Sequence, residues 1–259
     1  MADFLSASQI ITLLPWSIAS GSSESGGIPP GSKVLEIGPG QVDFTVALAD
    51  AVGPTGYVVA VDNAPPDYGM VARNRLLSPP RPLKHLILPW LVTDSSTIGT
   101  PLIEEAQAFS VASPLGDRIG FVRAGPLDFL SSAIEVAIQG FDFIVFYHCS
   151  GYFNRPNYVT RLLKLARSRV CTGLIAEYSL STSLRAAVPH VLSALVNNTL
   201  ESLQSEASMR NIRSAQTPPQ IIRAAEGAGW AGEDTGDRHT GTQTARWAQG
   251  SQHGGQVQV

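Results

Sequence analysis

The chain has 259 residues, is 44% hydrophobic and carries a formal net charge of −3 at pH 7. Its length and apolar content suffice for one enlarged domain with a sizeable core. Without a basic run, the composition argues against nucleic acid and a membrane surface as partners, and favours a small-molecule substrate. No apolar stretch approaches the roughly 20 residues that a membrane-spanning helix needs, so we expect a soluble, cytoplasmic protein.

Residues 1–32 are expected to form an amphipathic helix followed by a linker. Met1–Ser17 lacks the positively charged start and the small-residue cleavage site of a secretory signal. Gly21–Ser32 is rich in Gly, Ser and Pro, which is typical of a flexible connection. The core domain is therefore expected to span residues 33–233.

Short apolar runs alternate with helical segments in this domain. Strands are predicted over Lys33–Ile37, Gly56–Asp62, Ile119–Arg123, Phe141–Tyr147 and Val170–Ala176, and helices over Thr45–Val52, Tyr158–Arg169, Ser183–Leu203 and from Thr217 to Gly227 or Gly229. Such alternation predicts an α/β fold with a Rossmann-like, doubly wound parallel sheet. The two cysteines, Cys149 and Cys171, lie in apolar runs, and we expect both to be buried thiols.

Two segments depart from this alternation. Residues 70–99 are basic, interrupted by proline and without a clear period, so we interpret them as an insertion that is either a substrate lid or a tolerated surface loop. After Trp230 the chain has almost no aliphatic residues, and such a composition does not offset its own ordering entropy. Residues 234–259 are therefore expected to be a disordered tail.

An acid and two glycines mark the end of the first predicted strand. Glu36 precedes Gly38 and Gly40, and glycines allow backbone amides to approach a nucleotide closely. Asp62 ends the next strand, where its carboxylate can accept hydrogen bonds from ribose hydroxyls. Alternatively, Glu36 caps the following helix and Asp62 forms a turn before Asn63.

The residue at the third glycine position of a dinucleotide loop separates two cofactor classes. Asp43 stands there, and a carboxylate close to the helix amides disfavours a dinucleotide pyrophosphate. S-adenosyl-L-methionine (SAM) has no phosphate and carries a positive sulfonium, so it suits this loop better. An NAD(P)-dependent oxidoreductase is kept as the less favoured alternative.

Residues 34–45 and 53–62 carry a resemblance to a known family. The sequences VLEIGPGQVDFT and GPTGYVVAVD resemble motif I and the following acidic strand of class I SAM-dependent methyltransferases, in the manner of fungal-type small-molecule enzymes. A looser similarity extends over residues 30 to 231. The resemblance implies SAM-dependent methyl transfer to a small organic acceptor.

The resemblance also implies roles for individual residues. Glu36, Gly38, Pro39 and Gly40 would hold the methionine part of SAM, while Asp62 would bind the ribose and Asn63 would flank the adenine.

Two positions differ from the family pattern. Val42 replaces a customary glycine, and its branched side chain should crowd the cofactor. Pro126 follows Gly125 where the family commonly has an acid, which leaves Asp128 either to contact the adenine or to be a helix N-cap. These departures support an alternative, a non-catalytic homologue with impaired SAM binding.

Candidate catalytic residues follow the fourth predicted strand. His148 is either a general base for an acceptor hydroxyl or a strand-end histidine bonded to the backbone. Tyr152 and Phe153 either wall the methyl-donor pocket or pack in the core. Glu177 either orients substrate or forms a cap or salt bridge, whereas His190 and Trp230 are interpreted as packing residues. No group of residues has metal-ligand spacing, and methyl transfer relies mainly on proximity and alignment.

Overall fold

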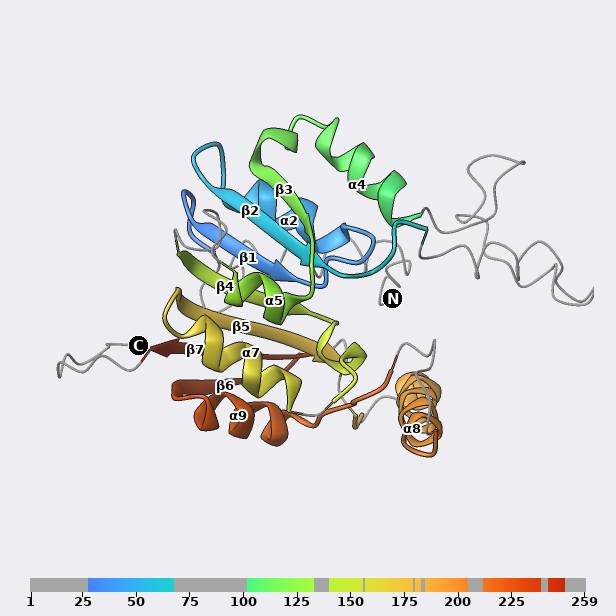
Figure 1. Ribbon diagram of the computed structural model, residues 1–259. Helices are drawn as coiled ribbons and strands as arrows, with labels where there is room; N and C mark the ends of the chain where they lie inside the picture. The colour runs from blue at the N-terminus through green and yellow to red at the C-terminus, as the bar shows by residue number, and fades with distance from the viewer. Residues whose placement is uncertain are drawn as a thin grey trace, which may run out of the picture.

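The computed structural model describes residues 28–67, 102–132, 140–155, 157–178, 180–182, 185–204, 212–238 and 242–249. Within these ranges a twisted seven-stranded sheet carries helices on both faces (Figure 1). The helix expected in the N-terminal region, before residue 28, and the insertion expected over residues 70–99 lie outside the described residues.

Five parallel strands form the larger part of the sheet. They are β1 (Lys33–Ile37), β2 (Tyr57–Asp62), β3 (Ile119–Arg123), β4 (Phe141–Tyr147) and β5 (Val170–Tyr178). The complete strand order is β3-β2-β1-β4-β5-β7-β6, so β1 lies between β2 and β4. The central strands consist mainly of buried aliphatic and aromatic residues, as expected where both faces of a parallel sheet are covered. The predicted α/β doubly wound sheet is thereby confirmed.

Helices connect the strands. They are α2 (Asp43–Ala51), α4 (Ile103–Val111), α5 (Pro126–Ser131), α7 (Tyr158–Ala166), α8 (Val188–Ser202) and α9 (Pro218–Gly227), with 3₁₀ turns η3 (Gly116–Arg118), η4 (Ser150–Tyr152) and η5 (Arg185–Ala187). One apolar cluster lies under α5, α7 and α9, and a second lies under α2 on the other face. Thr217 is the N-cap of α9, and the carboxamide oxygen of Gln220 accepts a hydrogen bond from its backbone N–H at 2.7 Å.

The C-terminal segment corrects the expectation of a disordered tail from residue 234. β6 (Trp230–Arg238) and β7 (Thr242–Gln249) form an antiparallel pair, and β7 also pairs with β5 along Thr172–Tyr178. Composition measures how much apolar surface a segment can bury, but the edge of β5 offers backbone N–H and C=O groups to any chain that reaches it. Residues 239–241 and 250–259 lie outside the described residues.

The two cysteines occupy different environments. Cys149 is buried as expected, but Cys171 is exposed, so the expectation of two buried thiols is wrong for Cys171. Val170 is buried, and the alternation of side chains along β5 turns the neighbouring Cys171 to the opposite face. Among the described residues, no helix combines the length and the apolar character required to cross a bilayer.

Candidate functional site

The predicted site residues gather at the carboxyl edge of the sheet, where the strand order reverses. β1 pairs with β2 on one side and with β4 on the other, and Ile37 lies opposite both Val61 and Phe146. The loops that leave β1, β2, β4 and β5 therefore share one edge. In open α/β sheets ligands bind at such a switch point.

The two glycines of the loop after β1 serve different purposes. Gly38 has a φ of 69°, and a Cβ at this position would lie 2.8 Å from Cβ of Cys149, which lies between β4 and η4. Gly40 has a φ of 53°, and a Cβ there would meet no heavy atom within 4 Å. Packing between the loops that follow β1 and β4 therefore requires Gly38, whereas Gly40 faces open space into which a ligand can approach the backbone.

Val42 adopts a backbone conformation that normally requires glycine. It has φ 65° and ψ 9° at the N-cap of α2, and its N–H donates to the Pro39 carbonyl at 3.0 Å. A β-branched residue in this left-handed region is a genuine outlier. The residue is only 6% exposed, so its side chain is buried. The unfavourable feature of valine at this position is therefore its strained backbone. This conformation gives a physical reason for the family's glycine at this position.

Glu36 is almost fully buried and bonded to the helix that follows it. Its Oε2 accepts a hydrogen bond from the Thr45 hydroxyl at 2.7 Å. Burial raises the pKa of Glu36 to about 8, the Thr45 hydrogen bond partly opposes this effect, and the nearby charge of Asp62 adds to it. Glu36 is therefore mainly neutral at pH 7.

Asp62 and Asn63 lie where β2 ends. Asp62 is half-buried, and its Oδ1 accepts the Ala64 backbone N–H at 2.9 Å, as the turn interpretation expected. Asn63 is exposed. A carboxylate has two oxygens, so this turn is compatible with a second role for Asp62.

Asp128 lies in the first turn of α5 and is exposed. The N-cap of this helix is Gly125, so the N-cap interpretation of Asp128 is wrong. Pro126 occupies the first turn of α5. Backbone N–H groups in the first turn of a helix have no intrahelical acceptor, so the absence of an N–H in proline costs no hydrogen bond there.

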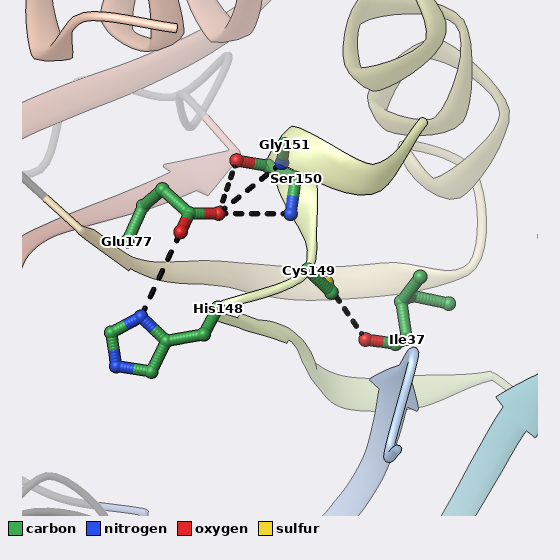
Figure 2. A network of polar contacts seen from close by, with 6 residues as sticks. All are labelled: Ile37, His148, Cys149, Ser150, Gly151 and Glu177. Carbon is green, nitrogen blue, oxygen red and sulfur yellow. Dashed lines mark hydrogen bonds and ion pairs between the residues drawn. The ribbon is translucent and has the colours of Figure 1, made fainter. Parts of the chain in front are cut away.

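His148 and Glu177 face each other at the ends of β4 and β5 (Figure 2). Nδ1 of His148 lies 3.7 Å from Oε1 of Glu177, and each side chain is 12% exposed. Oε2 of Glu177 accepts hydrogen bonds from the Ser150 N–H at 2.9 Å, the Ser150 hydroxyl at 2.6 Å and the Gly151 N–H at 3.4 Å. The carboxylate thus anchors η4 and also faces the imidazole.

The backbone of His148 is itself constrained. Its φ is 50°, and its N–H donates to the Ala176 carbonyl at 2.8 Å. The imidazole itself is turned towards Glu177. Histidine tolerates the left-handed region better than most residues, and strained backbone concentrates at functional sites.

Cys149 completes the network between β4 and β1. Its Sγ lies 2.9 Å from the Ile37 carbonyl and donates a hydrogen bond to it (Figure 2). Burial, together with the charges of Glu177, Glu36 and Asp62, raises the pKa of this thiol well above its usual value. The thiol therefore stays protonated and serves packing rather than nucleophilic chemistry.

The segment around residues 213–215 connects η4 to α8 by hydrogen bonds. The Gly151 carbonyl accepts hydrogen bonds from the N–H groups of Arg213 and Ser214 at 2.8 and 3.0 Å. The Ala215 N–H donates to Oδ1 of Asn198 on α8 at 2.9 Å. Sequence reasoning missed Ser150 and residues 213–215, because backbone hydrogen bonds between distant segments leave no pattern in side-chain type.

The aromatic and histidine candidates separate into different roles. Tyr152 is 46% exposed on η4, whereas Phe153 stacks on Tyr158 with ring centroids 4.5 Å apart, which is the packing role. Trp230 is buried and its Nε1 donates to the Leu163 carbonyl at 2.9 Å, as expected of a packing residue. His190 is exposed on α8, so its interpretation as a packing residue is wrong; the helical pattern did not reveal which face of α8 meets the core. Within the described part of the chain, no group of three or more His, Cys, Asp or Glu residues could hold a metal ion.

Comparison with known proteins places this geometry in a known fold. No protein-family model matches the sequence, and no curated protein matches it significantly. A cyclopropane-fatty-acyl-phospholipid synthase-like protein from Lactobacillus casei is similar in structure, with a TM-score of 0.70 and 21% identity over 95% of this chain and 94% of that chain.

Two further solved structures agree. A putative O-methyltransferase from Nostoc punctiforme has a TM-score of 0.59 and 13% identity, over 93% of this chain but only 57% of its own. Magnesium protoporphyrin IX methyltransferase from Synechocystis, solved with bound SAH, has a TM-score of 0.51 and 10% identity over 96% of this chain and 90% of its own. These similarities establish a class I SAM-dependent methyltransferase fold, which confirms the resemblance seen in the sequence.

Proposed function

We propose that this chain uses its class I methyltransferase fold to transfer a methyl group from SAM to a hydroxyl group of a small organic acceptor. One observation carries this proposal: the Gly38–Gly40 loop and the pair His148 and Glu177 lie at the same edge of the sheet. The loop follows β1, His148 follows the adjacent strand β4, and Glu177 lies on β5, the strand beyond β4. This arrangement supports the proposal, because a cofactor loop and a general base would have to lie close together.

The residues at this edge fit SAM. The open space at Gly40 allows the methionine part to approach the backbone, and Asp62 would accept hydrogen bonds from the ribose. When bound, SAM supplies a methyl group already activated by the positive charge of its sulfur. Glu36 is neutral and buried beneath the loop, so it would complete the loop as a hydrogen-bonding group.

His148 would take the proton of the acceptor hydroxyl. Because Nδ1 faces Glu177, Nε2 is the nitrogen that would accept this proton. The Glu177 carboxylate would then stabilise the imidazolium that forms, while its three hydrogen bonds from η4 hold it in position. Tyr152, exposed on η4, would contact the acceptor.

Binding of SAM and SAH by isothermal titration calorimetry tests the cofactor half of the proposal. We expect saturable binding that Asp62→Asn weakens by roughly 10- to 100-fold, because it loses charge-assisted hydrogen bonds. Asp67→Asn, at an exposed position shortly after the same strand, is the matched control and should bind as the wild type does. No saturation at millimolar SAM would contradict the proposal.

The release of SAH with a panel of small phenols and alcohols tests the catalytic half. His148→Gln should lower turnover by roughly 10²- to 10⁴-fold with little change in SAM affinity. Glu177→Gln should lower turnover to a smaller extent, because the imidazolium loses its counter-charge. Equal turnover in His148→Gln and wild type would remove His148 from the mechanism.

A second candidate is a non-catalytic homologue with the same fold. The left-handed backbone of Val42 favours it, because a strained residue replaces glycine in the cofactor loop. The calorimetric experiment separates the two candidates, since the homologue would bind SAM weakly or not at all.

A further inference from the structure

Helix α8 turns its more apolar face away from the rest of the fold. Among residues 188–202, all of which the structure describes, Ala194 alone is buried. Six apolar side chains of the helix and its C-cap are between 39% and 77% exposed: Val188, Leu192, Leu195, Val196, Leu200 and Leu203. Their spacing of three, four and seven or eight residues places them on one stripe, which we call the α8 stripe.

The opposite face of α8 is the one that is attached. Asn198 accepts the Ala215 N–H at 2.9 Å, and Glu201 lies 4.0 Å from Arg213. These polar residues point to the segment that holds η4, so the α8 stripe lies on the face of the helix turned away from that segment. Figure 1 shows α8 standing beside the sheet, beyond the end of β5.

The charge of α8 distinguishes between partners. Glu201 is the single carboxylate or strong base on the helix, and it is turned towards Arg213. Interfacial helices that lie on membranes carry Lys or Arg on their polar face, and α8 has neither. The flanks of the stripe are Ser, Thr and Asn, so two copies of the stripe can meet without repulsion between like charges.

We propose that the α8 stripe is a dimer interface in which α8 of one copy packs antiparallel against α8 of a second copy. A twofold interface needs a patch that is complementary to itself, and a neutral apolar stripe meets this condition. Its exposed apolar area is on the order of 500 Å² per copy, to which the polar flanks add, and standard interfaces bury about 800 Å² per partner. Leu195 lies at the centre of α8 and would therefore lie close to its own copy at the twofold axis.

Sedimentation equilibrium over a concentration series tests the proposal. The wild-type chain should reach twice its mass of 27.5 kDa. The double variant Leu192→Ser, Val196→Ser should raise the dimer dissociation constant by about 100-fold or more, since both side chains lie within the stripe. Phe109→Ser on α4 is the matched control, because Phe109 is 81% exposed but lies on another element, and it should dimerise as the wild type does.

Disulfide trapping gives a second measurement that does not depend on the serine variants, and so remains valid if those variants are unstable. In a Cys171→Ser background, which removes the exposed native thiol, Leu195→Cys should form an interchain disulfide under mild oxidation. His190→Cys is exposed on another face of α8 and should form little. The proposal would be overturned by a wild-type chain that stays monomeric at every concentration, which is also the result expected if residues 1–27 of the same chain cover the stripe. Equal disulfide trapping at positions 195 and 190 would overturn it as well.

Discussion

Replacing Glu36 by glutamine should stabilise the protein by an amount that grows with pH. Glu36 has a pKa of about 8 in the folded protein against an ordinary value of 4.5, because burial disfavours its charged form. Unfolding returns the carboxyl group to water, where it ionises from pH 4.5 upwards. Between these two values the unfolded state binds fewer protons than the folded state, so the free energy of unfolding falls as pH rises.

The size of the effect follows from the difference between the two pKa values. Each pH unit in this window lowers the free energy of unfolding by about 1.4 kcal/mol, which amounts to about 4–5 kcal/mol over the whole window. The stabilisation that comes from burying a protonated Glu36 is fully present below pH 4.5 and is lost once the pH passes about 8. Glutamine has nearly the same shape, can accept the Thr45 hydrogen bond and does not ionise, so it avoids this loss.

Urea denaturation followed by far-ultraviolet circular dichroism at a series of pH values measures the effect. The difference in unfolding free energy between Glu36→Gln and wild type should increase by about 4 kcal/mol from pH 5 to pH 8. Glu226→Gln on α9 is the control, because Glu226 is exposed, and its difference should stay within about 0.5 kcal/mol. A difference for Glu36→Gln that does not depend on pH would show that Glu36 is ionised in the folded protein, and would refute the reasoning.

Four further substitutions test the loop and the core. Gly38→Ala should cost about 3 kcal/mol of stability, because its methyl group meets Cys149, whereas Gly40→Ala should cost only about 1 kcal/mol. Gly40→Ala should instead weaken SAM binding in calorimetry by roughly tenfold or more, because its methyl occupies the open space, and the reverse ranking would contradict the assignment. Val42→Gly should tighten SAM binding while stability changes by less than about 1 kcal/mol, since relief of left-handed strain offsets the lost buried side chain; unchanged affinity would show that the valine is harmless. Trp230→Phe should lower the free energy of unfolding by about 1–2 kcal/mol, read from the urea midpoint, because the bond to the Leu163 carbonyl is lost; an unchanged midpoint would show that this bond contributes nothing.

The glycine loop shows how far sequence reasoning reached into the site. Two glycines after a buried strand predicted a close approach to the backbone, and the structure shows that Gly40 alone faces open space. Gly38 is required by Cys149, more than a hundred residues away in the chain. A motif identifies the positions where glycine is required, but it does not identify the neighbouring group that excludes a Cβ atom there.

The edge strands show where composition failed. Residues 234–238 and 242–249 were expected to be disordered because they have few apolar side chains, yet they extend the sheet from β5. Their pairing uses backbone groups that every residue except proline possesses. Cys171 and His190 were misplaced for a related reason, since the period of an element does not state which of its faces the rest of the fold covers.

The sequence by itself determined the alternation of strands and helices, the position of the glycine loop after β1 and the acids at the ends of β1 and β2. These features depend on residues near one another in the chain, through apolar periodicity and the conformational freedom of glycine. Only the tertiary structure decided that His148 faces Glu177, that Glu36 is buried deeply enough to stay neutral, and that α8 leaves an apolar stripe uncovered. Each of these depends on which distant segments pack together, and therefore on distances and burial that no local pattern records.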